Sequence, residues 1–111
     1  MEQNLMMIKG NTLSFGLEIE GIGQQLDSSY FTIRKDLDSD QFEVQKILGN
    51  GIWLDHSEGD TMFYAVRIAP ADTEDVESGL YHYDWTIEVN GDVFTVMYGV
   101  LTIQEDGYVL R

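Results

Sequence analysis

Two histidines and a few carboxylates are the residues of this sequence best suited to metal or acid–base chemistry. His82 and Asp84 alternate in "LYHYDW", so they share one face of an expected strand, and His56 lies in the loop-like "LDHSEGD". Two imidazoles and one carboxylate can hold zinc. The spacing contains no HExxH or other tight ligand pair, so we expect His82 to be a surface residue paired with a nearby acid. We assign no metal ligand.

An acidic run at positions 36–40, "DLDSD", begins like a calcium-binding loop. Carboxylates stand at its first, third and fifth positions. The later requirements fail, because Gln41 occupies the place of the obligatory glycine and Ile47 that of the bidentate glutamate. A solvated turn between two strands is the better interpretation.

Nucleophilic chemistry has little support in this sequence. There is no cysteine and no Gly-x-Ser-x-Gly elbow, and "GNG" at 49–51 lacks the Lys and Ser/Thr of a phosphate-binding loop. A carboxylate pair for glycosidic chemistry stays open, but 20 acidic residues make some close pair almost inevitable. We expect a protein that is not an enzyme, with no catalytic residue and no cofactor.

Aromatic side chains offer a different kind of site. Trp53, Tyr30 and Tyr98 could form a platform on which a sugar stacks. Strand pairing is expected to place Tyr98 in the core, which leaves Trp53 and Tyr30 as free candidates, with Trp53 the foremost. For Trp53 itself, a core plug or an oligomer contact is favoured over a glycan ligand.

The charge of the chain limits its partners. Twenty acids against six Lys and Arg give a formal charge of −14. Such a surface repels phosphate backbones and anionic lipid, so we expect no nucleic acid and no membrane partner. The opening "MEQNLMMIKG" lacks the features of a secretory leader, and no apolar run is long enough to span a bilayer. We therefore expect a soluble product made in the cytoplasm.

Alternation with a period of two dominates the sequence and predicts β-strands. "TLSFGLEIE" places Leu13, Phe15, Leu17 and Ile19 on one face. "YFTIRK" directs Phe31 and Ile33 inward in the same way. Strands are also expected around 5–8, within "QFEVQKILG", near 52–54, and in "TMFYAVRIA", where Met62, Tyr64, Val66 and Ile68 align.

The clearest local feature is a hairpin, "LYHYDWTIEV-NG-DVFTVMYGV". Asn90-Gly91 is typical of a two-residue type I′ turn. Continuous pairing from that turn sets Tyr83 against Tyr98 and Trp85 against Val96 on the core face. The other face would then carry Val93, Met97 and Leu101. A change of phase is expected at Gly99, because Leu101 and Ile103 carry the apolar pattern beyond it.

Residues 69–79, "APADTEDVESG", form a corner rather than a reactive loop. Pro70 ends a strand, Asp72 or Thr73 caps a short helical turn, and Gly79 releases the chain into the hairpin. Val76 is expected to plug the core. The whole chain, 1–111, thus predicts a single all-β domain: an antiparallel immunoglobulin-like sandwich of about seven strands with one helical turn near 72–78. A small barrel is the alternative.

Residues 67–103, "RIAPADTEDVESGLYHYDWTIEVNGDVFTVMYGVLTI", resemble a pattern of small phage and prophage tail proteins. An arginine-containing strand leads there to an Asp-Thr turn, a Gly-x-Tyr-x-Tyr-Asp strand and a hairpin. "IKGNTLSFGLEIE" and "FTIRK" are similar to the opening of the same proteins. The family resembled is the immunoglobulin-like N-terminal domain of baseplate upper, or tail-fibre adaptor, proteins. Those adaptors usually continue into a further C-terminal region, which this sequence does not show.

The resemblance implies a non-enzymatic assembly protein of a phage or prophage tail, acting through contacts with other tail or baseplate proteins. It would be found in the host cytoplasm during assembly and in the virion tail afterwards. A homo-oligomer is an open alternative, since tails are built of rings. The interaction surface is predicted at Trp53, Val93, Met97 and Leu101. A carbohydrate-binding module that uses Trp53 is the alternative function.

Overall fold

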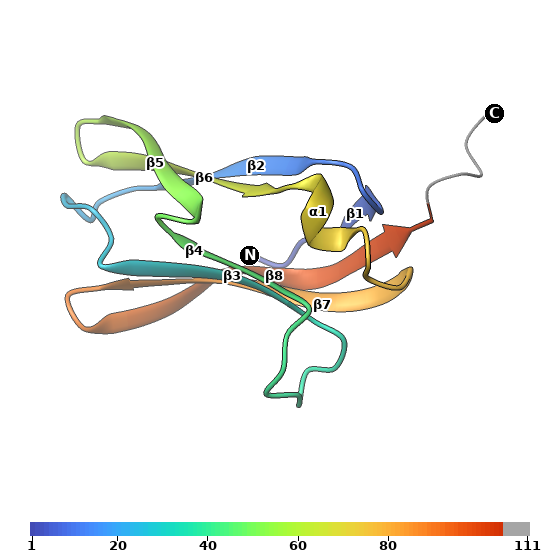
Figure 1. Ribbon diagram of the computed structural model, residues 1–111. Coiled ribbons are helices and arrows are strands. Elements are labelled where there is room, and N and C mark those ends of the chain that lie inside the picture. Colours follow the sequence, from blue (N-terminus) through green and yellow to red (C-terminus); the bar gives the residue numbers. More distant parts are fainter. Residues whose placement is uncertain (106–111) are drawn as a thin grey trace.

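The computed structural model describes residues 1–105 and shows an all-β protein (Figure 1). Eight strands and one helical turn follow one another along the chain. They are β1 (Leu5–Ile8), β2 (Leu13–Ile19), β3 (Ser28–Arg34), β4 (Val44–Leu48), β5 (Gly51–Glu58), β6 (Thr61–Ile68), α1 (Pro70–Thr73), β7 (Gly79–Val89) and β8 (Asp92–Gln104). The predicted all-β class is confirmed, with the strand near 52–54 extended to eight residues.

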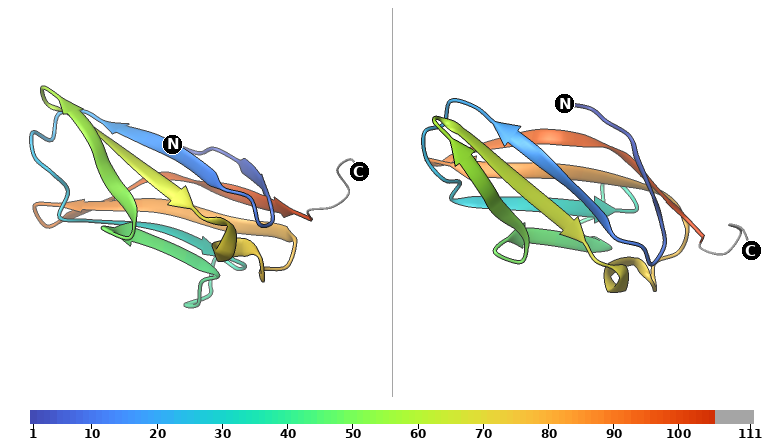
Figure 2. Two further views of the ribbon diagram at one scale, coloured as in Figure 1. Left: turned by 45° about the horizontal axis from the view of Figure 1, so that its top comes forward. Right: turned by 90° about the horizontal axis from the view of Figure 1, so that it is seen from above.

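All eight strands belong to one sheet, in the order β1-β8-β7-β3-β4-β5-β6-β2. The sheet folds over on itself into two layers, with β2, β5 and β6 above and β3, β4, β7 and β8 below (Figures 1 and 2). The two end strands of this order, β1 and β2, follow one another in the chain, which keeps the two ends of the sheet close together. The sheet is therefore nearly closed. Two neighbour pairs, β1 with β8 and β4 with β5, are parallel, so the sheet is mixed rather than purely antiparallel.

Alternation places the expected residues in the core between the layers. Phe31 and Ile33 of β3 are fully buried, as are Val66 and Ile68 of β6. The inward side chains of β2 pack against this core but remain half-buried, because β2 is an end strand with only β6 beside it. The predicted faces of β2, β3 and β6 are confirmed.

An aromatic cluster occupies the centre of the core. The rings of Phe15 and Phe31 both pack edge-on to Trp85, and Phe31 stacks on Tyr83 at a centroid distance of 5.4 Å. Trp85 is completely buried, and its indole Nε1–H donates to the Ser29 hydroxyl at 2.7 Å. This bond satisfies the one polar atom that the indole brings into the core.

The β7–β8 hairpin has the predicted turn but not the predicted register along its length. Asn90 and Gly91 both have positive φ, and Ile87 pairs with Phe94 as expected. A β-bulge then intervenes: Thr86 pairs with Thr95 but Trp85 pairs with Met97, so Val96 is the extra residue. The change of phase therefore occurs three residues before Gly99. An extra residue on one strand reverses the facing of everything beyond it.

The bulge corrects the assignment of three side chains. Met97 and Leu101, predicted on the outer face, point into the core and are buried. Tyr98, predicted in the core opposite Tyr83, lies opposite Asp84 on the outside. On β8, even-numbered residues such as Phe94 are therefore on the core side before Val96, and odd-numbered residues such as Met97 are on that side after it.

Gly99 has a role other than the predicted change of phase. The N-terminal segment runs parallel to β8, with Gln3 N–H donating to the Tyr98 carbonyl at 2.9 Å. A Cβ on residue 99 would collide with the Gln3 carbonyl. Only glycine allows the two backbones to approach so closely.

The corner between β6 and β7 is structural, as predicted, but its helical turn lies earlier. α1 begins at Pro70, whose missing N–H suits a first helical position, and ends at Thr73. Asp72 accepts a hydrogen bond from the Ala69 N–H at 2.6 Å, and the fully buried Thr73 accepts one from the Gly10 N–H. Val76 is buried, as expected for a core plug.

Candidate binding surfaces

The four residues predicted to form an interaction surface do not lie together. Trp53 is exposed on β5 in the upper layer, and Val93 is exposed on β8 in the lower layer. Met97 and Leu101 are buried, so they cannot contact a partner without unfolding of the core. The structure therefore divides the predicted surface into two separate regions.

The first region is the outer side of the lower layer. Exposed apolar side chains from four strands and one loop gather there, and we call them the lower outer face: Tyr30, Leu37, Ile47, Leu80, Val93 and Tyr98. Register places two of them side by side, since Ile47 of β4 pairs with Tyr30 of β3, and Tyr30 in turn pairs with Thr86 of β7. The strands pair edge to edge and do not cover these outward side chains, which stay exposed.

The 35–43 loop projects from the lower layer (Figure 1). A groove lies between this loop and β7 and β8. Leu37 of this loop, which is 74% exposed, lines the groove together with Tyr98 and Val100 of β8. His82 and Asp84 of β7 also line it. The groove combines an apolar lining with a few polar groups, which suits recognition of another protein.

The histidines and acids do not form a metal centre. His82 is in the lower layer on β7, whereas His56 is on β5, stacked on Phe63 and 2.7 Å from the Asp55 carboxylate. Asp84 pairs with Arg34 at 3.3 Å. Within residues 1–105 no group of three or more His, Cys, Asp or Glu side chains is arranged to hold a metal ion.

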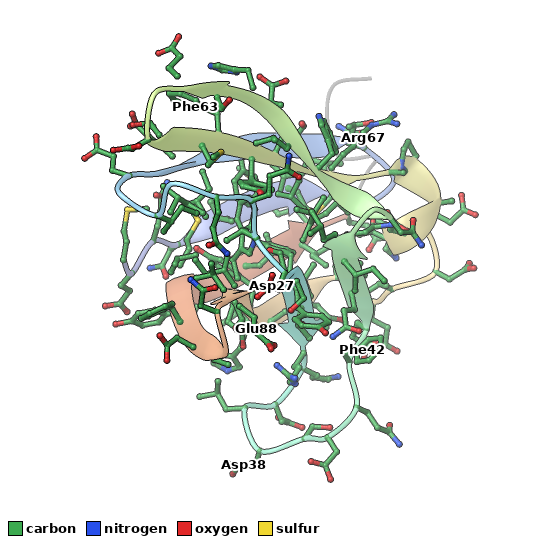
Figure 3. All side chains as sticks on the ribbon, turned by 90° about the vertical axis from the view of Figure 1, so that its left-hand side faces the viewer. Asp27, Asp38, Phe42, Phe63, Arg67 and Glu88 are labelled. Atoms are coloured by element: carbon green, nitrogen blue, oxygen red, sulfur yellow. The ribbon has the colours of Figure 1, made fainter. Side chains whose placement is uncertain are left out.

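The second region is a depression on the outer side of the upper layer, lined by Lys46, Asn50, Gly51, Trp53, Arg67 and Ala69. We call it the Trp53 depression. Trp53 lies opposite Ala65 of β6, which lies opposite Gly16 of β2, so small residues extend the surface beside the indole. Arg67 points outward because its neighbours Val66 and Ile68 face the core. Phe63, further along β6, shares this outer side (Figure 3).

Arg67 differs from the other cations. Lys9, Arg34, Lys35 and Lys46 each form an ion pair, with Glu105, Asp84, Glu77 and Asp72 respectively. Among the residues that the structure describes, Arg67 is the one Lys or Arg without such a partner. Its guanidinium is exposed next to an exposed indole, on a chain of net charge −14.

Two tyrosines near the groove have altered acidity. Burial raises the pKa of Tyr81, and the carboxylates of Glu43 and Glu77 raise it further. Burial also raises the pKa of Tyr83. Both hydroxyls donate to backbone carbonyls, Tyr81 to Glu77 at 2.6 Å and Tyr83 to Gln3. These phenols therefore stay protonated near neutrality, as their donated hydrogen bonds require.

Comparison with known proteins adds no family to this description. No protein-family model matches the sequence, and a search of curated proteins gives no significant match. The part of the chain described also has no helix long and apolar enough to cross a membrane. The protein is defined by its architecture: an all-β, nearly closed two-layer domain with an apolar face below and an aromatic–cationic depression above.

Sequence reasoning missed Arg67, Tyr98 and Leu80 as surface residues. The alternation of "TMFYAVRIA" already directs Arg67 outward, so that signal was present. Leu80 is likewise out of phase with Tyr81 and Tyr83. Tyr98 had no such signal, because its facing depends on the bulge at Val96.

Proposed function

We propose that this protein is a non-enzymatic assembly module whose contact surface is the lower outer face. The observation that carries the proposal is the number of exposed large apolar side chains on this one side of the sheet, with Tyr98 beside Leu37 and with Leu80 and Val93 toward the two ends of the β7–β8 hairpin. Large exposed apolar side chains are common at the interaction sites of soluble proteins, and tyrosine is enriched at interfaces.

The shape of the lower layer agrees with an assembly role, and the charge of the chain makes self-assembly depend on salt. The groove beside Leu37 offers a concave apolar lining, and β2 leaves one strand edge without a partner among the described strands. Each copy carries −14, so copies repel one another at low ionic strength. Self-association through an apolar face would therefore strengthen as salt screens that repulsion.

Within this proposal, the assembly is the tail of a phage or prophage, and the partners are other tail or baseplate proteins. The support for this step is the resemblance of residues 67–103 to tail adaptor domains. The proposed location is the host cytoplasm during assembly and the virion tail afterwards. Detection of the protein in purified tail particles by mass spectrometry would test it, and its absence from intact particles would count against it.

The interface itself is tested by sedimentation over a concentration series at low and high salt. Tyr98→Ser combined with Leu80→Ser should abolish any oligomer of the wild-type chain. Trp53→Ser is the matched control, because it removes an exposed aromatic side chain from the other layer. A wild-type chain that is monomeric throughout, and that binds no tail protein on co-expression, would refute the proposal.

A further inference from the structure

We propose that the Trp53 depression binds a saccharide bearing a single carboxylate, with the sugar ring on Trp53 and the carboxylate on Arg67. This site is on the upper layer and goes beyond the assembly role proposed for the lower outer face. The two proposals can therefore fail separately.

The indole supplies the apolar half of such a site. Trp53 is 41% exposed, whereas the other tryptophan, Trp85, is completely buried. Beside Trp53 the outer surface is lined by Gly51, Ala65 and Gly16, whose small side chains leave the indole accessible. A flat ring with one apolar face and polar edges can pack against an indole placed in this way.

The guanidinium supplies the charged half. Arg67 lines the same depression and has no ion-pair partner within residues 1–105. Its planar fork of donors matches a carboxylate in a bidentate geometry. Asn50 and Lys46 line the same space, and Lys46 keeps donor capacity beyond its 2.8 Å bond to Asp72. These groups suit sugar hydroxyls.

The charge of the rest of the molecule argues for one carboxylate rather than many. Asp72 already neutralises Lys46, and Glu18 and Asp55 lie further along the same outer side. A polyacidic peptide or a phosphate chain would bring several charges toward a protein of −14 and would be repelled. A largely neutral saccharide places a single charge beside Arg67, the one Lys or Arg of residues 1–105 without an ion-pair partner.

Titration of the full chain with 3′-sialyllactose and with lactose tests this, because the two differ by one carboxylate-bearing residue. Intrinsic fluorescence reports on Trp53, since Trp85 is shielded, and calorimetry gives the affinity of each sugar. Sialyllactose should bind at least roughly tenfold more tightly than lactose, as expected for one charge-assisted hydrogen-bonded contact.

Variants separate the two halves of the site. Trp53→Ala should abolish binding of both sugars by calorimetry. Arg67→Gln should lower the affinity for sialyllactose to that for lactose, and Arg67→Lys should restore part of the preference. Lys35→Gln is the matched control, because it makes the same change in net charge on an exposed cation and should leave the preference intact. Near-UV circular dichroism of Trp85 confirms that each variant is folded.

Three results would overturn the proposal. One is equal affinity for the two sugars, or none at millimolar concentration. Another is a Lys35→Gln effect as large as that of Arg67→Gln, which would mean a general charge effect. The third is equally tight binding of a monoacidic peptide, N-acetyl-Gly-Glu-Gly amide, that depends on Arg67, which would make the site a peptide site.

Discussion

Gly99 lies so close under Gln3 that a single methyl group on its Cα would overlap the Gln3 carbonyl. The contact joins the first residues of the chain to its last strand. Hydrogen bonds fix it on both sides, from Gln3 N–H to Tyr98 and from Val100 N–H to the Asn4 side chain at 3.1 Å. The N-terminal segment thus closes over one end of the sheet.

Replacing Gly99 by alanine should destabilise the protein by about 1–3 kcal/mol, because the N-terminal segment must move away. Urea unfolding monitored by fluorescence measures the change. Gly16→Ala is the control, since its Cβ would be an ordinary 3.4 Å from the Tyr64 carbonyl. Deleting residues 1–4 should remove the part of this cost that comes from Gln3 and leave only the backbone strain of alanine at a φ of +158°. An equal cost with and without the segment would show that Gln3 is not the cause.

Removing the Ser29 hydroxyl should destabilise the fold by about 1–3 kcal/mol, because the buried Trp85 Nε1–H would lose its acceptor. Ser29→Ala changes the volume little, so the effect reports the unsatisfied donor. Ser57→Ala, on the exposed end of β5, should change stability by less than about 0.5 kcal/mol. Thermal unfolding of both variants provides the comparison, and similar melting temperatures would contradict the role given to Ser29.

Stability should fall as the pH rises above about 10. The pKa values of Tyr81 and Tyr83 are raised in the folded state, whereas the same phenols in the unfolded chain ionise near 10. Above that pH the unfolded state binds fewer protons than the native state, so the free energy of unfolding decreases until the folded phenols also ionise. Below pH 10 the contribution is fully present.

Phenylalanine at either position tests this origin of the alkaline transition. Tyr81→Phe and Tyr83→Phe should each flatten the fall in urea midpoint above about pH 10. In each variant the free energy of unfolding at neutral pH should also fall by about 1 kcal/mol, because the hydrogen bond from the phenol to a backbone carbonyl disappears. Tyr30→Phe, exposed on β3, is the control. An unchanged slope in both variants would assign the transition to other groups.

Asp72 joins the corner to the sheet, since it accepts the Ala69 N–H and pairs with Lys46 at 2.8 Å. Asp72→Ala should cost about 1–2 kcal/mol through loss of the turn contact and of a largely shielded ion pair. Asp75→Ala removes an exposed acid from the same corner and should be nearly neutral. If the two variants melt together, the acids of this corner serve only as surface charge.

Much of the fold is readable from local sequence because its cause is local. Alternation predicts the inward faces of β2, β3 and β6, since a strand turns successive side chains to opposite sides. Asn90-Gly91 predicts the hairpin turn because that turn requires positive φ at both positions. Val76 and the corner followed from the same kind of local chemistry, although α1 begins two residues earlier than expected.

The candidate surfaces depended on contacts between distant segments. Alternation alone cannot reveal the extra residue at Val96, yet that residue moves Met97 and Leu101 into the core and Tyr98 to the surface. Nor does local pattern reveal that Gly99 makes room for Gln3, or that every other Lys and Arg in residues 1–105 is paired while Arg67 is not. The sequence by itself determined which strands form and which way most of them face, because those choices depend on neighbours in the chain. Only the tertiary structure decided which aromatic and charged groups remain available to a partner, because availability depends on what the rest of the chain covers.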